Sequence, residues 1–234
     1  MITFIVPARG GSQRLPNKNI KELNGKPLIF YTIESLLNQD LITRIIFTSD
    51  SQDYCEKVRE EFGNKVTIEL RPPETATNTT KVVDEIERLL KKKPVYFDSE
   101  WFGMALPTAP LRNHKTVSKA LDFFTETKSP LFSCNSYDFP VQFAFKFEKV
   151  NLKQNWTSIS KESPMITGNT RSQDIEKFFR PNGALYINTK SNFLESKILY
   201  KNANAFEISQ IESMDIDTEL DFKIAEAIIK ENYE

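Results

Sequence analysis

Ile2-Thr3-Phe4-Ile5-Val6-Pro7 is followed directly by Ala8-Arg9-Gly10-Gly11-Ser12-Gln13-Arg14-Leu15-Pro16-Asn17-Lys18-Asn19. The first part is nearly all apolar and predicts a buried strand. The second part holds two of the seven glycines of the chain and predicts a loop at the carboxyl end of that strand. This stretch therefore favours an α/β protein whose first strand delivers a loop to one edge of a sheet.

Four more short runs rich in β-branched and aromatic residues follow, and helical patterns separate them. The expected strands cover residues 44–48, 66–70, 101–106 and 130–134. The expected helices cover residues 27–38 and 52–62, a stretch that begins at Thr79 or Thr80, and residues 116–124. Strands joined by helices pair in parallel through right-handed crossovers. We expect an α/β fold with a doubly wound, mostly parallel, Rossmann-like sheet, whose ligands bind at the carboxyl ends of the strands.

The pattern changes between residues 139 and 177. Residues 141–147 alternate like an exposed strand, and the stretch after them is polar and irregular. Regular α/β structure resumes at residues 183–188, and a helix is expected from Thr218 to Glu231. We expect one domain over residues 1–234 that carries a small insertion over residues 139–177.

The composition removes several classes of function. The 234 residues include one histidine, His114, and two cysteines, Cys55 and Cys134, which are too few for a usual zinc site or a disulfide scaffold. His114 has no neighbouring carboxylate to orient it, so a catalytic triad is not expected. A net charge of −1 gives no sign of a nucleic-acid partner. No apolar run is long enough for a membrane span, and we expect a cytoplasmic protein with no membrane partner.

The loop after the first strand carries the strongest chemical signal. Glycines at positions 10 and 11 can form an anion-binding nest of backbone N–H groups, and Arg9, Arg14 and Lys18 add the positive charge that a polyphosphate requires. Neither GxxxxGK[ST] nor GxGxxG is present, so the loop is neither a Walker A loop nor a dinucleotide fingerprint. The alternative is an ordinary glycine turn beside a solvated basic segment.

Asp215 and Asp217 form a second signal near the end of the chain. In an extended segment, carboxylates two residues apart point to one side and can share a Mg²⁺ together with substrate phosphates. The alternative reading is a helix start, with Asp217 as the N-cap residue. Capping alone explains Asp217 but does not explain Asp215.

Five motifs together resemble those of the acylneuraminate cytidylyltransferase family, which makes CMP-activated sialic acids and related nonulosonic acids. The motifs are residues 7–19, residues 71–76 with Thr79, residues 106–112, residues 179–188 and residues 213–221. They occur in the order of the family and extend over nearly the whole chain. The resemblance implies a Rossmann-like nucleotidyltransferase that uses CTP and Mg²⁺, transfers CMP to the anomeric hydroxyl of a nonulosonic acid and releases pyrophosphate.

The same resemblance assigns roles to individual residues. The implied catalytic residues are Arg9, Lys18, Asp215 and Asp217, of which the two aspartates hold the metal. The implied nucleotide-binding residues are Ala8, Arg9, Gly10, Gly11, Ser12, Lys18, Asn19, Arg71 and Thr79. The implied sugar-binding residues are Leu106, Thr108, Arg171, Arg180 and Tyr186. The insertion is implied to be a dimerisation arm, which makes a homodimer the expected assembly.

One position departs from the pattern of the family. Members specific for sialic acid commonly have glutamine where this chain has Leu106, and that glutamine contacts the sugar. The stretch from Ser12 to Pro16 also resembles the pseudaminic-type branch. A deoxygenated acceptor of the legionaminic or pseudaminic type is therefore as open as sialic acid. Two further alternatives remain, a 3-deoxy-manno-octulosonate cytidylyltransferase and a non-catalytic nucleotide-binding regulator on the same scaffold.

Overall fold

The computed structural model describes residues 1–12, 14–150, 153–169 and 171–231, and the chain divides into two compact units. Unit 1 comprises Met1–Cys134 and Pro181–Glu234, and unit 2 comprises Asn135–Arg180. Unit 2 contains all of the insertion predicted at residues 139–177 and extends beyond it at both ends.

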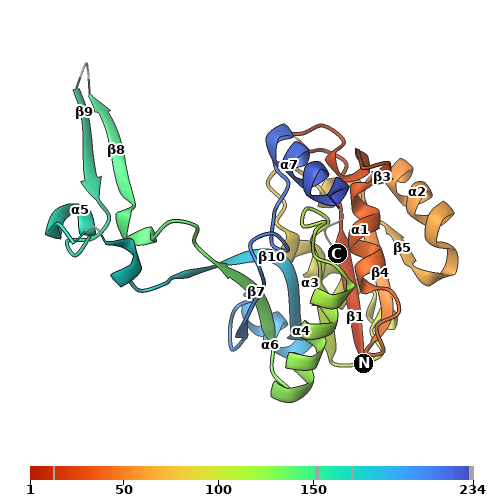
Figure 1. The fold of residues 1–234 in the computed structure, drawn as a ribbon. Helices are drawn as coiled ribbons and strands as arrows, with labels where there is room; N and C mark the ends of the chain where they lie inside the picture. Colours follow the sequence, from red (N-terminus) through yellow and green to blue (C-terminus); the bar gives the residue numbers. More distant parts are fainter. Residues whose placement is uncertain (13, 151–152, 170, 232–234) are drawn as a thin grey trace. The chain divides into compact units, whose positions relative to one another are not determined.

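A seven-stranded sheet forms the centre of unit 1 (Figure 1). Its strands are β1 (Ile2–Pro7), β4 (Ile42–Ser49), β5 (Thr67–Leu70), β6 (Trp101–Met104), β7 (Leu131–Ser136), β10 (Phe179–Thr189) and β11 (Asn204–Glu207). Their order across the sheet is β11-β7-β10-β6-β1-β4-β5. β1 pairs in parallel with β4 and β6, β4 with β5, and β11 with β7, whereas β10 pairs antiparallel with β6. The prediction of a mostly parallel α/β sheet is confirmed.

Helices cover both faces of the sheet. They are α1 (Leu28–Leu36), α2 (Gln52–Phe62), α3 (Val82–Lys92), α4 (His114–Thr127), α6 (Lys190–Ser196) and α7 (Glu219–Lys230). Phe4 and Val6 of β1 belong to the apolar cluster that holds side chains of α1, α2 and α4. Ile5, which points to the opposite face, belongs to the cluster of α3 and α6. The sheet is therefore doubly wound, and a small antiparallel hairpin of β2 (Glu22–Leu23) and β3 (Lys26–Pro27) precedes α1.

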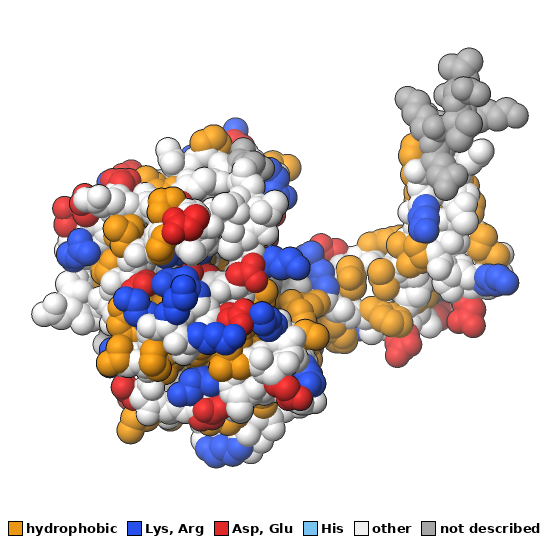
Figure 2. Space-filling model, turned by 180° about the vertical axis from the view of Figure 1, so that it is seen from behind, with side chains coloured by type: hydrophobic (Ala, Val, Ile, Leu, Met, Phe, Trp, Pro, Cys, Tyr) orange, Lys and Arg blue, Asp and Glu red, His pale blue; other side chains and the backbone are white. Residues whose placement is uncertain are grey.

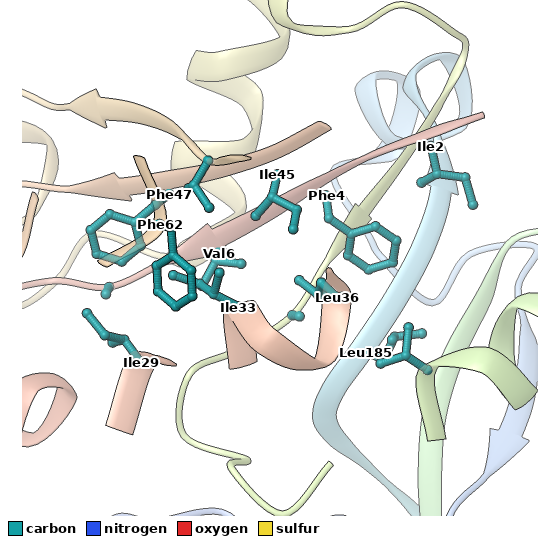
Figure 3. Close-up of a cluster of buried hydrophobic side chains, with 14 of the residues drawn as sticks. Ile2, Phe4, Val6, Ile29, Ile33, Leu36, Ile45, Phe47, Phe62 and Leu185 are labelled. Atoms are coloured by element: carbon teal, nitrogen blue, oxygen red, sulfur yellow. The ribbon is translucent and has the colours of Figure 1, made fainter. Parts of the chain in front are cut away.

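The larger apolar cluster holds β1 and β4 against α1 and α2 (Figure 3). Phe4, Val6 and Phe47 from the strands and Ile33 from α1 are fully buried. Burying one such side chain contributes about 1.5–3 kcal/mol. Gly103 of β6 makes this packing possible, because a Cβ atom at that position would overlap the ring of Phe4.

Helix starts differ from the predicted ones where a nearby polar group offers a better cap. The helix expected from Thr79 or Thr80 begins at Val82, because the Thr80 hydroxyl accepts a hydrogen bond from the Thr77 N–H within a turn. The Asp84 carboxylate then accepts from the Lys81 N–H at 2.8 Å. Those two threonines were therefore wrong as caps.

The last helix is capped one residue later than the alternative reading of the sequence required. The Thr218 hydroxyl accepts from the Asp221 N–H, and the Asp221 carboxylate accepts from the Thr218 N–H at 2.7 Å. This reciprocal capping box leaves the Asp217 side chain out of the cap. Asp217 as N-cap is therefore wrong, and its carboxylate makes other contacts.

Unit 2 contains a hairpin and a short helix. β8 (Phe145–Val150) pairs antiparallel with β9 (Lys153–Ser158), and α5 covers Pro164–Thr167. The exposed strand predicted over residues 141–147 is wrong in its first part, because Val141–Phe143 forms a 3-10 turn. Large apolar side chains are nevertheless exposed on this unit, among them Phe139, Phe145, Phe147, Trp156, Ile159 and Phe178.

A buried group of charges joins α3 to β4 and β5 in unit 1. Glu85 is almost fully buried on α3 and accepts hydrogen bonds from the Thr48 hydroxyl at 2.6 Å and from Arg88 Nε at 2.7 Å. One Glu85 oxygen also lies 3.7 Å from Arg71 Nη1. Arg88 in turn donates to Glu69 at 3.0 Å. Since two guanidinium groups depend on one buried carboxylate, this group is sensitive to loss of Glu85.

Among the residues that the structure describes, no helix is both long and apolar enough to cross a membrane.

We predict that Glu85→Ala lowers the free energy of unfolding by about 3–5 kcal/mol, because it leaves Arg71 and Arg88 without their shared partner in a region that excludes water. Glu226→Ala is the matched control, since Glu226 is partly exposed and pairs with Lys230 one turn later on α7. That control should cost less than about 1 kcal/mol. Urea unfolding followed by circular dichroism measures both variants, and equal losses would contradict the prediction.

Candidate active site

A cavity of about 480 Å³ opens in unit 1 where β1, β5 and β6 end. The loop after β1, the residue after β5, the start of α3, the loop after β6 and the segment before α7 supply its wall. The lining residues are Pro7, Arg9, Ser12, Arg14, Leu15, Lys18, Asn19, Arg71, Ala76, Thr77, Thr80, Lys81, Val82, Leu106, Pro107, Thr108 and Asp217. The cavity is thus at the sheet edge where a doubly wound fold binds its ligands.

The charges on this wall favour an anionic ligand. The five cations are Arg9, Arg14, Lys18, Arg71 and Lys81. Asp217 is the one carboxylate among the lining residues, which are all described. Lys and Arg side chains gather with a few acidic ones in the middle of the face of unit 1 that Figure 2 shows. A wall with this surplus of positive charge suits a ligand that carries several negative charges, such as a polyphosphate.

Two buried polar atoms on the wall have no partner among the described residues. They are the side-chain carbonyl oxygen of Asn19 and the Nε of Arg71. Both residues are more than nine-tenths buried, with exposed fractions of 5% and 6%. Leaving such groups unpaired is costly, so they are expected to gain partners from a ligand. One is an acceptor and the other a donor, which fits a ligand that offers both kinds of group.

Asp217 is held by two cations of the first loop. Its carboxylate lies 2.8 Å from Arg14 Nη2 and 3.0 Å from Lys18 Nζ. Lys18 is buried, and its ammonium group also donates to the Ile216 carbonyl oxygen at 2.5 Å. Lys18 therefore fixes the segment before α7 against the loop after β1. The ammonium group predicted to face the phosphates is engaged by protein acceptors in the structure.

Asp215 lies two residues before Asp217 and is not among the residues that line the cavity. Asp215 is exposed, yet the protein around its carboxyl removes enough hydration to raise the pKa of that group. The neighbouring charge of Asp217 raises this pKa further, whereas the Thr108 hydroxyl, Lys18 and Arg14 lower it. The charge of Asp217 thus disfavours ionisation of Asp215.

This pair fits a divalent cation by the chemistry of its donors. Carboxylate oxygens are the ligands that Mg²⁺ prefers, and one or two of them with substrate phosphates complete a usual site. In the described part of the chain, no group of three or more His, Cys, Asp and Glu side chains is arranged as a metal site. Asp215 and Asp217 would thus hold a cation only together with a ligand that brings its own oxygen atoms.

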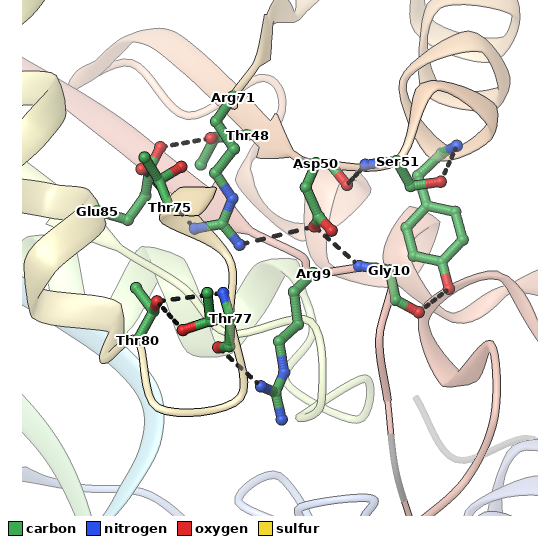
Figure 4. Close-up of polar contacts among 12 residues, drawn as sticks. Arg9, Gly10, Thr48, Asp50, Ser51, Arg71, Thr75, Thr77, Thr80 and Glu85 are labelled. Carbon is green, nitrogen blue, oxygen red and sulfur yellow. Dashed lines mark hydrogen bonds and ion pairs between the residues drawn. The ribbon is translucent and has the colours of Figure 1, made fainter. Parts of the chain in front are cut away.

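The glycine pair is used differently from the nest that the sequence suggested. The Gly10 N–H donates to the Asp50 carboxylate at 3.0 Å, and a Cβ atom at Gly10 would lie 3.2 Å from the Cβ of Ser51 (Figure 4). Gly11 has open space around it. Neither glycine nor Ala8 is among the residues that line the cavity, whereas Arg9 and Ser12 are. A side chain at position 10 would therefore crowd Ser51 at the start of α2.

Arg71 lies beneath the cavity between two carboxylates. Its Nη1 is 3.7 Å from Glu85 and its Nη2 is 4.0 Å from Asp50. Burial lowers the pKa of the Arg71 guanidinium, and Glu85 and Asp50 counteract part of that effect. No motif in the sequence marks Asp50, Glu85 or Lys81 as part of this site. A carboxylate on the apolar side of the helix is the signal that could have indicated Glu85.

A loop of threonines lies beside Arg9. Arg9 Nη1 approaches the Thr77 carbonyl oxygen at 3.4 Å and the Asn78 side chain at 3.5 Å (Figure 4). Thr77 and Thr80 line the cavity, but the predicted Thr79 does not, and its hydroxyl lies 3.2 Å from that of Thr77. The threonine loop thus contributes two hydroxyl-bearing residues to the wall, on either side of the one predicted.

The residues predicted to bind the sugar are spread over both units. Leu106 and Thr108 line the cavity in unit 1. Tyr186 of unit 1 is buried in the core, where its hydroxyl lies 3.1 Å from that of Tyr200 and burial raises its pKa. Arg171 and Arg180 belong to unit 2 and are exposed, and Arg171 lies 3.2 Å from Asp174.

Hydrogen bonds to a buried arginine and to the segment before α7 fix the loop that carries Leu106 and Thr108. Arg112 is fully buried and donates to the carbonyl oxygens of Leu106 and Ala184. The Thr108 carbonyl oxygen accepts from the Ile216 N–H at 2.8 Å. The loop after β6 therefore contacts both β10 and the segment that bears Asp215 and Asp217.

Relatives of this chain are known over its full length. It is 32% identical over 235 residues to the pseudaminic acid cytidylyltransferase of Campylobacter jejuni subsp. jejuni serotype O:23/36 (strain 81-176), with 98% of this chain and 97% of that protein covered. It is 30% identical over 245 residues to the CMP-N,N'-diacetyllegionaminic acid synthase of Legionella pneumophila subsp. pneumophila, with 100% and 98% covered. The N-acylneuraminate cytidylyltransferase of Escherichia coli O18:K1:H7 is 30% identical over 227 residues, which are 96% of this chain and 51% of that protein.

The fold is also known from a solved structure, that of CMP:2-keto-3-deoxy-manno-octonic acid synthetase complexed with CTP. The two structures superpose with a TM-score of 0.66 at 15% sequence identity, over 99% of this chain and 100% of that one. At this identity the likeness concerns the fold alone. A family profile described as cytidylyltransferase matches residues 3–233. Because this match spans nearly the whole chain and a full-length relative is 32% identical, the chain belongs to the cytidylyltransferase family of nucleotidyltransferase enzymes.

Proposed function

We propose that the protein transfers CMP from CTP to the anomeric hydroxyl of a nonulosonic acid and releases pyrophosphate. The observation that carries this proposal is the cavity itself, whose lining residues include five cations, one carboxylate and two residues with an unpartnered buried polar atom. Pseudaminic, legionaminic and neuraminic acids occur in the names of relatives that match at least 93% of this chain. The negative charge of a triphosphate would balance the surplus positive charge of this wall.

Four of the five cations divide into two groups by their contacts. Arg9 and Lys81 line the cavity and are free enough of carboxylates to receive the phosphates of CTP. Lys18 and Arg14 instead hold Asp217 in place. Positioning and charge neutralisation supply most of the rate in phosphoryl transfer, so a residue that fixes a carboxylate contributes as directly as one that touches a phosphate.

Asp215 and Asp217 would hold Mg²⁺ together with the phosphates of CTP, as expected from the resemblance. The cation, when bound, supplies charge neutralisation at the α-phosphate. Lys18 keeps the Asp217 carboxylate oriented toward the cavity through its bond to the Ile216 carbonyl oxygen. The chain then brings the acceptor hydroxyl and the α-phosphorus together in line, with pyrophosphate leaving on the far side.

We predict that Asp217→Asn abolishes pyrophosphate release but retains CTP binding. The substitution removes a metal ligand and also frees Arg14 and Lys18, so CTP should bind at least as tightly without Mg²⁺ as it does to the unaltered protein. Isothermal titration with CTP, with and without Mg²⁺, measures this directly. Unaltered protein should gain affinity from Mg²⁺ and the variant should not. Turnover near the original rate would contradict the metal assignment.

Leu106 gives the cavity an apolar side next to Thr108, which favours an acceptor with a methyl or deoxy carbon at that point. Gly183 leaves room for this side chain, since a Cβ atom at Gly183 would lie 2.9 Å from the Leu106 Cδ1. A pseudaminic-type or legionaminic-type acid has such a carbon, whereas a hydroxyl group there would lose a hydrogen-bond partner. We therefore propose a deoxygenated nonulosonic acid as the acceptor.

We predict that pyrophosphate release with pseudaminic or legionaminic acid exceeds that with N-acetylneuraminic acid by about tenfold or more in kcat/KM, which is the usual size for one mismatched polar group. Leu106→Gln should narrow this ratio. A coupled pyrophosphate assay on a panel that includes 3-deoxy-manno-octulosonic acid tests the assignment. Preference for the octulosonic acid would replace the proposed acceptor, and no turnover with any member would contradict the function.

Unit 2 is proposed as the dimerisation arm. Its exposed aromatic side chains suit burial against a second copy, and Figure 2 shows apolar side chains over much of this unit.

We predict that light scattering gives about twice the chain mass of 27.0 kDa and that Phe147→Ser combined with Trp156→Ser gives the monomer mass. Phe147 and Trp156 face each other in the register of the hairpin, so one pair of changes removes adjacent apolar surface. A monomer for the unaltered chain would contradict the arm.

A further inference from the structure

Asp50 contacts Arg71 on the cavity wall and Gly10 in the loop that carries Arg9 and Ser12, although no motif in the sequence marks it. It follows β4 directly, and its carboxylate accepts a hydrogen bond from the Gly10 N–H at 3.0 Å. The same oxygen lies 4.0 Å from Arg71 Nη2. Figure 4 shows Asp50 between these two groups. One carboxylate thus links the loop after β1 to the residue after β5.

Gly10 is held on three sides by residues that follow β4. The Asp50 carboxylate accepts from its N–H, the Tyr54 hydroxyl lies 3.4 Å from its carbonyl oxygen, and Ser51 fills the space that a Cβ atom at position 10 would approach. These three residues lie between the end of β4 and the first turn of α2, whose start is fixed by the Ser51 hydroxyl. The peptide of Gly10 therefore has a position that the β4–α2 connection sets. The position of Gly10 in turn determines where Arg9 and Ser12, which flank it in the loop, lie on the cavity wall.

Arg71 is anchored to the same connection. Its backbone N–H donates to the Ser49 carbonyl oxygen at 2.8 Å, and its guanidinium group lies between Glu85 and Asp50. Glu85 is shared with Arg88 and Thr48, so it cannot fix Arg71 alone. The charge of Asp50 is the second constraint on the direction of Arg71. The Nε of this guanidinium group is buried and has no partner among the described residues. A hydrogen bond from it to a ligand would depend on the direction in which Asp50 and Glu85 hold the group.

Asp50 does not itself reach the ligand space. Neither Asp50 nor Gly10 is among the residues that line the cavity, whereas Arg9, Ser12 and Arg71 are. A carboxylate behind a phosphate loop would repel a triphosphate if it were exposed to it. Here the loop stands between the two, so the effect of Asp50 on the ligand is transmitted through Gly10 and Arg71.

We propose that Asp50 is a positioning residue for nucleotide binding, which holds the Gly10 loop and Arg71 in one fixed arrangement. This inference rests on the proposed function, in that it takes CTP as the ligand. A competing arrangement would have the carboxylate occupy the Gly10 N–H in place of a phosphate oxygen and leave when CTP binds. The two arrangements predict opposite effects of removing the carboxylate.

Asp50→Ala and Asp50→Asn separate the contribution of the hydrogen bond to Gly10 from that of the charge that faces Arg71. Asp53→Asn is the matched control. Asp53 lies in the first turn of α2, is exposed and is 3.8 Å from Lys57. The alanine variant loses both contacts of Asp50. The asparagine variant keeps a side-chain oxygen for the Gly10 N–H but loses the charge that faces Arg71. Full-length protein is titrated with cytidine, CDP and CTP by calorimetry, and the thermal unfolding of each variant is recorded to confirm that it is folded.

We expect Asp50→Ala to weaken CTP binding by about tenfold to a hundredfold, the size of one hydrogen bond to a charged group. Asp50→Asn should recover part of the loss, and Asp53→Asn should bind as the unaltered chain does. The loss should be larger for CTP and CDP than for cytidine, because the loop faces the phosphates. In turnover, KM for CTP should rise while kcat stays nearly constant, which a partly unfolded preparation would not produce.

Two results would overturn the inference while leaving the proposed function intact. Tighter CTP binding by Asp50→Ala would mean that the carboxylate competes with phosphate, and unchanged binding would mean that Asp50 has no role. Failure of the unaltered chain to bind CTP at all would instead contradict the proposed function. If Asp50→Ala does not fold, the comparison of Asp50→Asn with Asp53→Asn still decides, since a fall in CTP affinity confined to the former supports the inference.

Discussion

The buried ammonium group of Lys18 is the contact on which the arrangement of the site depends. It binds the Ile216 carbonyl oxygen and the Asp217 carboxylate, which lie 198 and 199 residues further along the chain. One charged group with two acceptors on the same short segment leaves that segment little freedom. Lys18 therefore joins the cationic loop to the segment that bears Asp217, although nearly the whole chain separates them. The Ile216 N–H extends this assembly to Thr108.

Much of the fold could be predicted from the sequence, because strands and helices differ in the period of their apolar residues. The strand at residues 44–48 and the helix at residues 52–62 were expected within a few residues of β4 and α2, and the resemblance to cytidylyltransferases is confirmed by the family match. Parallel pairing then follows from the spacing, and parallel pairing brings the strand ends to one edge. Eight of the predicted site residues lie on the cavity wall at that edge, namely Arg9, Ser12, Lys18, Asn19, Arg71, Leu106, Thr108 and Asp217.

What could not be predicted depends on distances between segments. One example is the face of the sheet on which the Tyr186 side chain lies. A strand covered on both faces has no amphipathic pattern from which the two faces could be distinguished. The role of Gly10 is another. A glycine pair predicts close approach of the backbone to something, but only the folded chain shows that Ser51 and Asp50 are the neighbours. The predicted start of a helix was wrong where a polar group other than the expected cap binds the first backbone N–H groups. At α3 this group is the Asp84 carboxylate, which accepts from the Lys81 N–H.

The two sets of charges around the cavity also differ in their access to water. Arg14, whose side chain is 70% exposed, meets Asp217 in contact with solvent, whereas Arg71 and Glu85 are enclosed by protein. Dissolved salt screens exposed charges over about 8 Å at physiological ionic strength but reaches buried pairs only weakly. Rising ionic strength therefore loosens the contact of Arg14 with Asp217 and leaves the partners of Arg71 in place. The position of Asp217 on the cavity wall is therefore sensitive to salt concentration, whereas the position of Arg71 is not.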